Sequence, residues 1–177
     1  MLIAMVKAAK ILLSKNYNVK LLFVGRGDAF SYLKEYVSNE KLQEHVLVHH
    51  SMPHFMIPLL LEVSDIVLAP YPININWYVQ HPLKVVESLG LLKPVITSPL
   101  RELREIMPKE LLIDTAKSER LPQEIAQKIE KILAIMREKD SKEYRVLFEE
   151  LKKLQARFSW ENIARKLYNC LYEMLKQ

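Results

Sequence analysis

Short apolar runs alternate with helical patterns over roughly the first two thirds of the chain. Five runs of mostly apolar residues are each bounded by Gly, Pro or polar residues, as buried strands are. Between them, apolar residues recur at three- and four-residue spacing, which predicts amphipathic helices. This alternation is typical of a Rossmann-like, doubly wound α/β fold with a parallel sheet of about five strands. The predicted strands are 19–24, 46–48, 65–69, 94–97 and 111–113.

The remaining residues predict helices that follow one another without strands. One apolar stripe begins at Leu121, a second at Leu147 and a third at Ile163, and Ser159 is a suitable N-cap for the last helix. We therefore expect a Rossmann-like domain over residues 1–157 and a separate C-terminal helix over 158–177.

Composition describes an ordinary globular protein. The 177 residues are 50% apolar and 27% charged, and no window resembles a membrane span. The N-terminus lacks the layout of a signal peptide, and the single cysteine, Cys170, excludes an internal disulfide, so we expect a cytoplasmic protein. Cys170 itself reads as a small apolar core residue. Three glycines with abundant Lys, Glu and Ile resemble a thermophile's composition.

Charge and motifs exclude several classes of function. The net charge of +5 suits anionic ligands such as nucleoside diphosphates, or an acidic lipid surface, but no basic cluster with aromatics indicates nucleic acid. Neither a G-x-S-x-G motif nor a P-loop is present, and G-R-G lacks the third glycine of a dinucleotide fingerprint. Because adjacent histidines on a strand point to opposite faces, His49, His50 and His54 do not predict a metal centre.

The segment from His81 to Ser98 carries the clearest chemistry. It predicts a short helix that begins after Pro82 and ends at Gly90, followed by a buried strand, with Glu87 in the middle of the helix. In doubly wound sheets, ligands bind beyond the C-terminal ends of the strands. Those ends are residues 25–27, 49–51, 70–80 and 97–105, so Glu87 lies beside a predicted ligand site.

The order of motifs resembles the C-terminal domain of GT-B retaining glycosyltransferases, the large GT4-like group. The resemblance covers nearly the whole chain and rests on these stretches, in order: V-G-R-G, V-L-V-H-H, S-D-I-V-L-A-P, P-L-K-V-V-E-S-L-G-L-L-K-P-V-I-T-S, E-I and F-S-W-E. In that family the C-terminal domain binds the nucleotide-sugar donor, and the N-terminal domain binds the acceptor. The resemblance therefore implies the donor half of a metal-independent, retaining sugar transfer, with no cofactor beyond the nucleoside diphosphate sugar as substrate.

The resemblance also implies roles for single residues. Glu87 matches the second glutamate of the E-x7-E motif, which binds the ribose hydroxyls, and a carboxylate can accept from two vicinal hydroxyls. Pro82, Leu83 and Lys84 match the helix start that faces the diphosphate. Further donor contacts are expected from His81, Arg26 and Glu105, and from the loops around the base, Gly25, Gly27, His50 and Ser51. No catalytic residue is assigned.

Three departures limit what the resemblance implies. Val79 stands where the first glutamate of E-x7-E would fall, and Pro99 to Glu102 replaces a Gly-Gly turn. The family's first strand, which ends in Gly-Arg and is central in the sheet, has no counterpart before the first helix. Two buried strand edges would then face each other across a gap. Three arrangements would avoid such a gap: the chain is a fragment of a longer protein, the sheet closes over the gap, or a partner supplies the strand. We favour a fragment that is inactive by itself.

Two other functions remain open at this stage. The apolar face of the last helix would lack its usual partner, the N-terminal acceptor domain, and could instead dock a separate subunit or self-associate, as in a non-catalytic interaction module. A sugar-nucleotide epimerase of the same topology is the weaker alternative. Trp77 and Tyr78 could stack on a base or sugar or simply pack their loop. The sequence fixes neither the base and sugar of the donor nor the acceptor and linkage.

Overall fold

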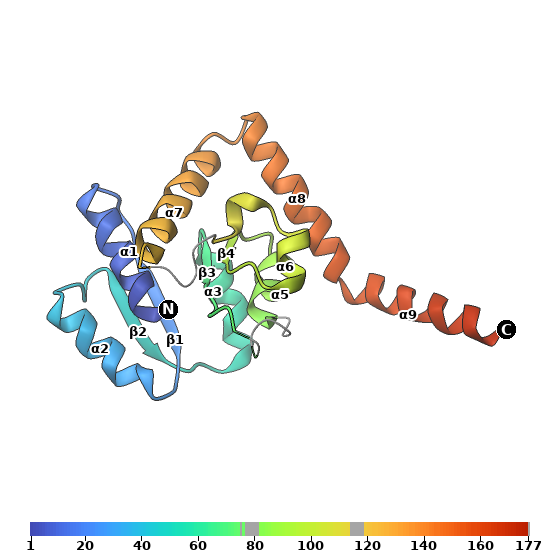
Figure 1. Ribbon diagram of the computed structural model, residues 1–177, viewed down its shortest axis with the longest axis horizontal. Helices are drawn as coiled ribbons and strands as arrows, with labels where there is room; N and C mark the ends of the chain where they lie inside the picture. Colours follow the sequence, from blue (N-terminus) through green and yellow to red (C-terminus); the bar gives the residue numbers. More distant parts are fainter. Residues whose placement is uncertain (75, 77–81, 114–118, 177) are drawn as a thin grey trace.

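The computed structural model describes residues 1–74, 76, 82–113 and 119–176, and its fold is α/β. Its first part is a parallel pair of strands with two helices on one side (Figure 1). Leu21 lies opposite Val46, and Gly25 lies opposite His50. In chain order, the elements are α1 (Leu2–Ser14), β1 (Leu21–Gly25), α2 (Ala29–Asn39) and β2 (Val46–His50).

The second part is another parallel pair, in which Val67 lies opposite Val95 and Ala69 opposite Thr97. Thr97 also forms an isolated parallel bridge with Leu112, at the position of the fifth predicted strand. Its elements are the 3₁₀ turn η1 (His54–Met56), α3 (Ile57–Val63), β3 (Val67–Ala69), α5 (Leu83–Gly90), β4 (Val95–Thr97), α6 (Arg101–Ile106) and the 3₁₀ turn η2 (Lys109–Leu111).

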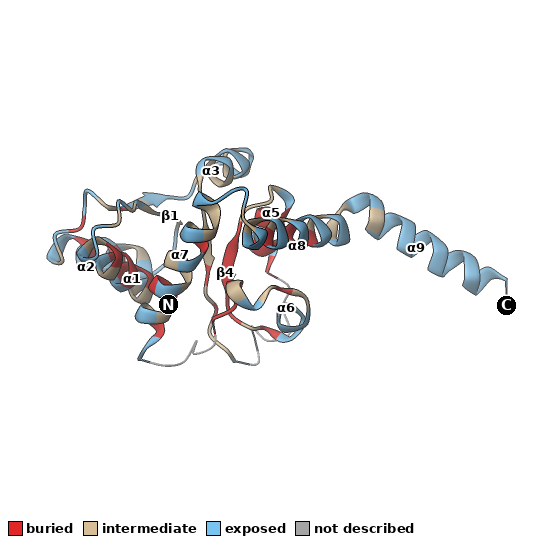
Figure 2. Ribbon diagram, turned by 90° about the horizontal axis from the view of Figure 1, so that it is seen from above, coloured by how far each residue is buried: buried red, intermediate tan, exposed pale blue. Residues whose placement is uncertain are grey.

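Three helices complete the chain, as predicted: α7 (Leu121–Arg137), α8 (Lys142–Phe158) and α9 (Trp160–Leu175). Helix α7 packs against α1, and α8 packs against α5. Helix α9 extends away from the rest of the molecule, and none of its residues is buried (Figures 1 and 2). The Ser159 hydroxyl caps α9 by accepting a 3.3 Å hydrogen bond from the Asn162 backbone N–H, as predicted.

One local prediction is wrong. Cys170 is exposed rather than in the core, because α9 contacts the rest of the chain only near its start, next to α8. Asp28 stands at the N-cap of α2 but has a helical backbone, and its side chain accepts no capping bond. An effective N-cap residue usually has extended dihedral angles that aim its oxygen at the first turn, as Ser159 does.

The strands form two separate two-stranded sheets, β1–β2 and β3–β4, rather than one. The α/β fold class and the parallel strands are confirmed. Among the described strands, β1 does not pair with β3, so the two sheets are not joined into one. Each sheet therefore has an edge strand, β1 or β3, at the side where the sequence places the gap. The apolar residues of both still pack against the larger of two core clusters.

Burial is concentrated between the helices and these sheets (Figure 2). The larger cluster joins α1, α5, α7 and α8 to the β3–β4 sheet, and its fully buried residues include Leu12, Leu89, Ile96, Ile125 and Leu151. A smaller cluster lies between α1, α2 and the β1–β2 sheet and includes Val6 and Val37. None of the described helices is long and apolar enough to cross a bilayer.

Amide hydrogen exchange should report the free edge of β1. The Leu21 N–H bonds to the His45 carbonyl of the neighbouring segment. Because alternate residues of a parallel strand bond to the same neighbour, the Phe23 N–H also points toward β2, whereas the N–H groups of Leu22 and Val24 point away from it. We expect the amides of Leu22 and Val24 to exchange at least about tenfold faster than that of Phe23. Equal protection at all three positions, measured by NMR, would show that this edge is covered.

Candidate functional site

Buried hydroxyls fix the ends of β3 and β4, where the candidate site begins. The Ser98 hydroxyl donates to the Tyr71 carbonyl at 2.7 Å and accepts from the Tyr71 N–H at 2.8 Å. One residue earlier, the Thr97 hydroxyl donates to the Ala69 carbonyl at 2.9 Å. Ser98 and Thr97 are fully buried, so these bonds satisfy backbone groups that water does not reach. They hold Tyr71 in place where the chain leaves β3.

Helix α5 places two charged residues next to Tyr71. Its buried face, Val85, Ser88 and Leu89, packs into the core, which leaves Lys84 and Glu87 on the accessible side. These two are three residues apart and so lie on the same face of the helix. Buried Pro82 is the N-cap residue, and no described side chain caps the first turn, in which the Val85 N–H already bonds to the Pro82 carbonyl.

Tyr71 lies near both of these charges. Lys84 Nζ is 5.8 Å from the centroid of the Tyr71 ring. Burial raises the pKa of Tyr71, and the nearby Glu87 carboxylate raises it further, so the phenol is neutral at ordinary pH. The Glu87 side chain is 37% exposed, and its Oε1 is 4.0 Å from Nε2 of the highly exposed His54. The group therefore offers a carboxylate and an ammonium to the solvent side of α5, next to the buried, neutral phenol of Tyr71.

A second group lies at the ends of β1 and β2. Register places Gly25 beside His50, so Arg26, Gly27 and Ser51, which follow them, gather at the same edge. Gly27 has a φ of 136°, a conformation that favours glycine, and space for a side chain is open at Gly25 and Gly27. The His50 ring stacks on Phe30 with centroids 4.1 Å apart, so one face of the imidazole is already covered by α2.

The structure thus arranges most of the predicted residues in two groups, and His54, outside both, approaches the first of them. Pro82, Leu83, Lys84 and Glu87 share α5, while Gly25, Arg26, Gly27, His50 and Ser51 share the ends of β1 and β2. His54, which follows β2 in the chain, makes this approach to Glu87. Glu105 is exposed on α6, and in the described part no ion pair joins it to either group. His81, Trp77, Tyr78 and Val79 lie outside the described residues.

Sequence reasoning missed the roles of Tyr71, Ser98 and His54. Tyr71 and Ser98 were placed only in strand-end loops, and His54 was considered only for a metal. A hydroxyl residue directly after the buried run of β4 is a weak signal for such a bond. The partner, 27 residues earlier in the chain, appears only in the fold.

The groups can bind an anion and a pair of hydroxyls. Lys84, Arg26 and the N–H groups at the start of α5 supply positive charge and donors, and Glu87 supplies an acceptor. Within the described ranges, no three His, Cys, Asp or Glu side chains gather as a metal site would require.

Comparisons with known proteins show the family and the fold of this chain. The family model described as "Glycosyl transferases group 1" matches residues 2–154, so the chain belongs to the group 1 glycosyltransferases. A crystal structure of a glycosyltransferase from Rickettsia africae ESF-5 superposes with a TM-score of 0.69 at 19% identity, which shows a shared fold. The alignment covers 99% of this chain but 45% of that one. No curated protein sequence matches.

Replacing Ser98 by Ala should destabilise the protein, because it removes the buried hydroxyl that bonds both the N–H and the carbonyl of Tyr71. We expect a loss of about 1–3 kcal/mol in the free energy of unfolding, measured by urea titration. Ser14→Ala, which removes an exposed hydroxyl, is the matched control and should change stability by less than about 0.5 kcal/mol. An unfolding midpoint for Ser98→Ala equal to that of the control would contradict the role of this bond.

Proposed function

We propose that this chain is the donor-binding half of a metal-independent, retaining glycosyltransferase. The observation that carries the proposal is the placement of Glu87 and Lys84 on one face of α5, beside buried Tyr71, in a chain of this family. The proposed ligand is a nucleoside diphosphate sugar, which combines a dianionic diphosphate with the vicinal hydroxyls of a ribose.

Each residue has a proposed contact. Glu87 would accept hydrogen bonds from both ribose hydroxyls; it is part-exposed, and no described lysine or arginine is paired with it. Lys84 and the N–H groups of the first turn of α5 would face the diphosphate, because the start of a helix favours negative charge. Arg26, exposed after β1, would add positive charge from the other group. Gly25, Gly27, His50 and Ser51 would line the base, and Glu105 and His81 would complete the donor contacts.

In the proposed reaction, the bond between the anomeric carbon and the diphosphate oxygen breaks, and a bond to an acceptor oxygen forms. The nucleoside diphosphate leaves with the bonding electron pair, and the acceptor hydroxyl gives up its proton. This chain would contribute positioning and stabilisation of charge on the departing diphosphate. The chain spans 45% of the length of the glycosyltransferase it resembles in structure, so we propose that an acceptor-binding domain completes the enzyme.

Helix α9 favours a second candidate, a protein-interaction module. Its apolar residues are exposed, with Trp160 at 85%, Leu167 at 60% and Leu175 at 86% of their full accessibility. Such a face on a free helix is costly in water unless another surface covers it. The same face would serve the first candidate by docking the acceptor-binding domain, so nucleotide affinity decides between the two.

Calorimetry with UDP, GDP and ADP tests the donor site. We expect one of the three to bind weakly to the 177-residue chain and Glu87→Ala to lower that affinity about 10- to 100-fold, because a charged hydrogen-bond acceptor is lost. Glu35→Ala is the matched control: it also removes an exposed mid-helix carboxylate, but on α2, and should leave the affinity unchanged.

Equal affinity in the wild type and Glu87→Ala would remove Glu87 from the site. Sugar transfer by the isolated chain would contradict the half-enzyme proposal. A stoichiometric protein partner, found by pull-down and light scattering, together with no affinity for any of the three nucleotides, would favour the interaction module.

A further inference from the structure

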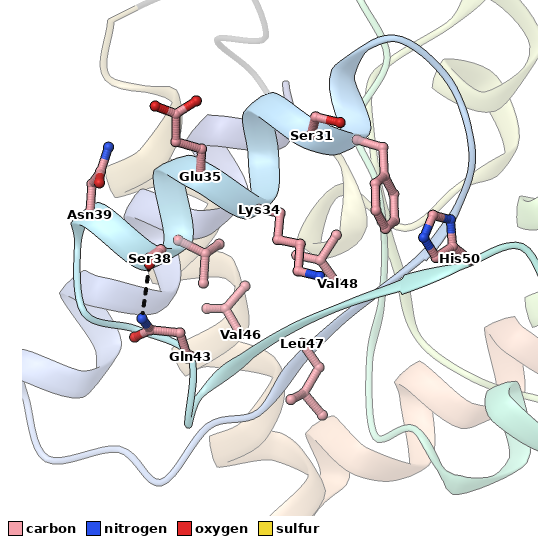
Figure 3. Close-up of a pocket in the computed structure, with 12 residues that line it drawn as sticks. Ser31, Lys34, Glu35, Ser38, Asn39, Gln43, Val46, Leu47, Val48 and His50 are labelled. Atoms are coloured by element: carbon pink, nitrogen blue, oxygen red, sulfur yellow. Dashed lines mark hydrogen bonds between the residues drawn. The ribbon is translucent and has the colours of Figure 1, made fainter.

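A groove runs between helix α2 and the outer edge of the β1–β2 sheet, apart from the α5 site. Its volume is about 690 Å³, within the range of natural ligand pockets. Val37, Val46 and Val48 line its apolar floor, and Val37 and Val46 are buried. Val46 and Val48 are labelled in Figure 3. The Gln43 amide bonds to the Ser38 hydroxyl near one end, and His50 stacks on Phe30 near the other.

The edge of β2 presents unused backbone groups along this groove. The Leu21 N–H donates to the His45 carbonyl, which sets the alternation along β2. The backbone N–H and carbonyl groups of Leu47 and His49 therefore point toward β1, and those of Val46, Val48 and His50 point away from it. The Val46 N–H bonds to the Leu42 carbonyl, which agrees with that orientation. Val48 therefore directs both its N–H and its carbonyl away from β1, and no described strand pairs with this edge.

The edge also lacks the usual protection against pairing. Natural edge strands carry lysine or proline, or are interrupted by a bulge. β2, with the sequence V-L-V-H-H, has no lysine or proline and pairs with β1 in continuous register. Its five residues span about 16 Å at the rise of an extended chain, so the edge can pair with a peptide of about five residues.

Charge inside the groove comes from Lys34. The Lys34 side chain points toward Val48, whereas Glu35 and Asn39, which also line the groove, direct their side chains away from β2 (Figure 3). Among the described residues, no carboxylate pairs with Lys34, which is exposed. A ligand that places a carboxylate near Lys34 would thus gain an ion pair, and a basic ligand would be repelled.

We propose that this groove binds an extended peptide of a partner protein, which adds a strand to the edge of β2. The peptide pairs its backbone with Val48, points apolar side chains at the floor of Val37 and Val46, and sets an acidic group near Lys34. The groove shares His50 with the proposed base contacts of the donor site, whereas Val46 and Val48 belong to the groove alone.

The probe is a fluorescein-labelled octapeptide of alternating Val and Thr that ends in Asp with a free carboxylate. Its anisotropy is measured against the 177-residue chain, and NMR of the labelled chain locates the bound peptide. We expect Lys34→Glu to weaken binding at least about tenfold, because it replaces attraction with repulsion. The charge-matched control is Lys166→Glu on α9, which should leave the affinity unchanged. Val48→Pro removes an outward N–H without touching a bond to β1 and should weaken binding similarly.

Amide shifts at Val46, Val48 and His50, with the expected loss in Lys34→Glu, would support the proposal. Absence of binding at about 1 mM peptide, or equal affinity in Lys34→Glu and Lys166→Glu, would overturn it. Lys34→Glu does not touch the core, so this comparison holds even if Val48→Pro fails to fold. A concentration-dependent doubling of mass that Val48→Pro abolishes would show that a second copy, rather than a partner peptide, covers the edge.

Discussion

The hydrogen bonds between Ser98 and Tyr71 fix the strand ends next to α5, where the candidate donor site lies. One buried hydroxyl satisfies both backbone groups of the residue at which the chain leaves β3, and so it joins the C-terminal ends of β3 and β4. Tyr71 then lies near Lys84 and Glu87 of α5. Without that join, the α5 charges would still share a helix face, but the neutral phenol beside them would lose its fixed position.

The second constraint is the division of the strands into two sheets. A parallel strand is normally paired on both sides and covered on both faces, yet β1 and β3 each pair on one side among the described residues. One face of the β1–β2 sheet is incompletely covered, because Leu22 of β1 and Leu47 of β2 are each at least 43% exposed. Helix α3 contributes no residue to either core cluster. The candidate donor site, the proposed peptide groove and the α9 face therefore belong to a structure in which several surfaces are uncovered.

Local patterns were predictable from the sequence, and contacts across the fold were not. The limits of α5 followed from Pro82 and Gly90, and the cap of α9 from Ser159, because those signals act within one turn. The Ser98–Tyr71 bond and the approach of His54 to Glu87 join residues far apart in the chain, which periodicity does not report. Exposure of Cys170 was mispredicted for the same reason: an amphipathic stripe shows that a face is apolar, not whether anything covers it.

The central claim is that α5 and the loop after β1 bind a nucleoside diphosphate. A titration of the isotopically labelled chain with UDP, GDP and ADP, followed by amide NMR, tests it most directly because it locates the ligand as well as detecting it. The account predicts that the largest shifts fall at Leu83, Lys84 and Glu87 and at Arg26 and Gly27. Shifts confined to other surfaces, or none with any of the three nucleotides, would contradict it.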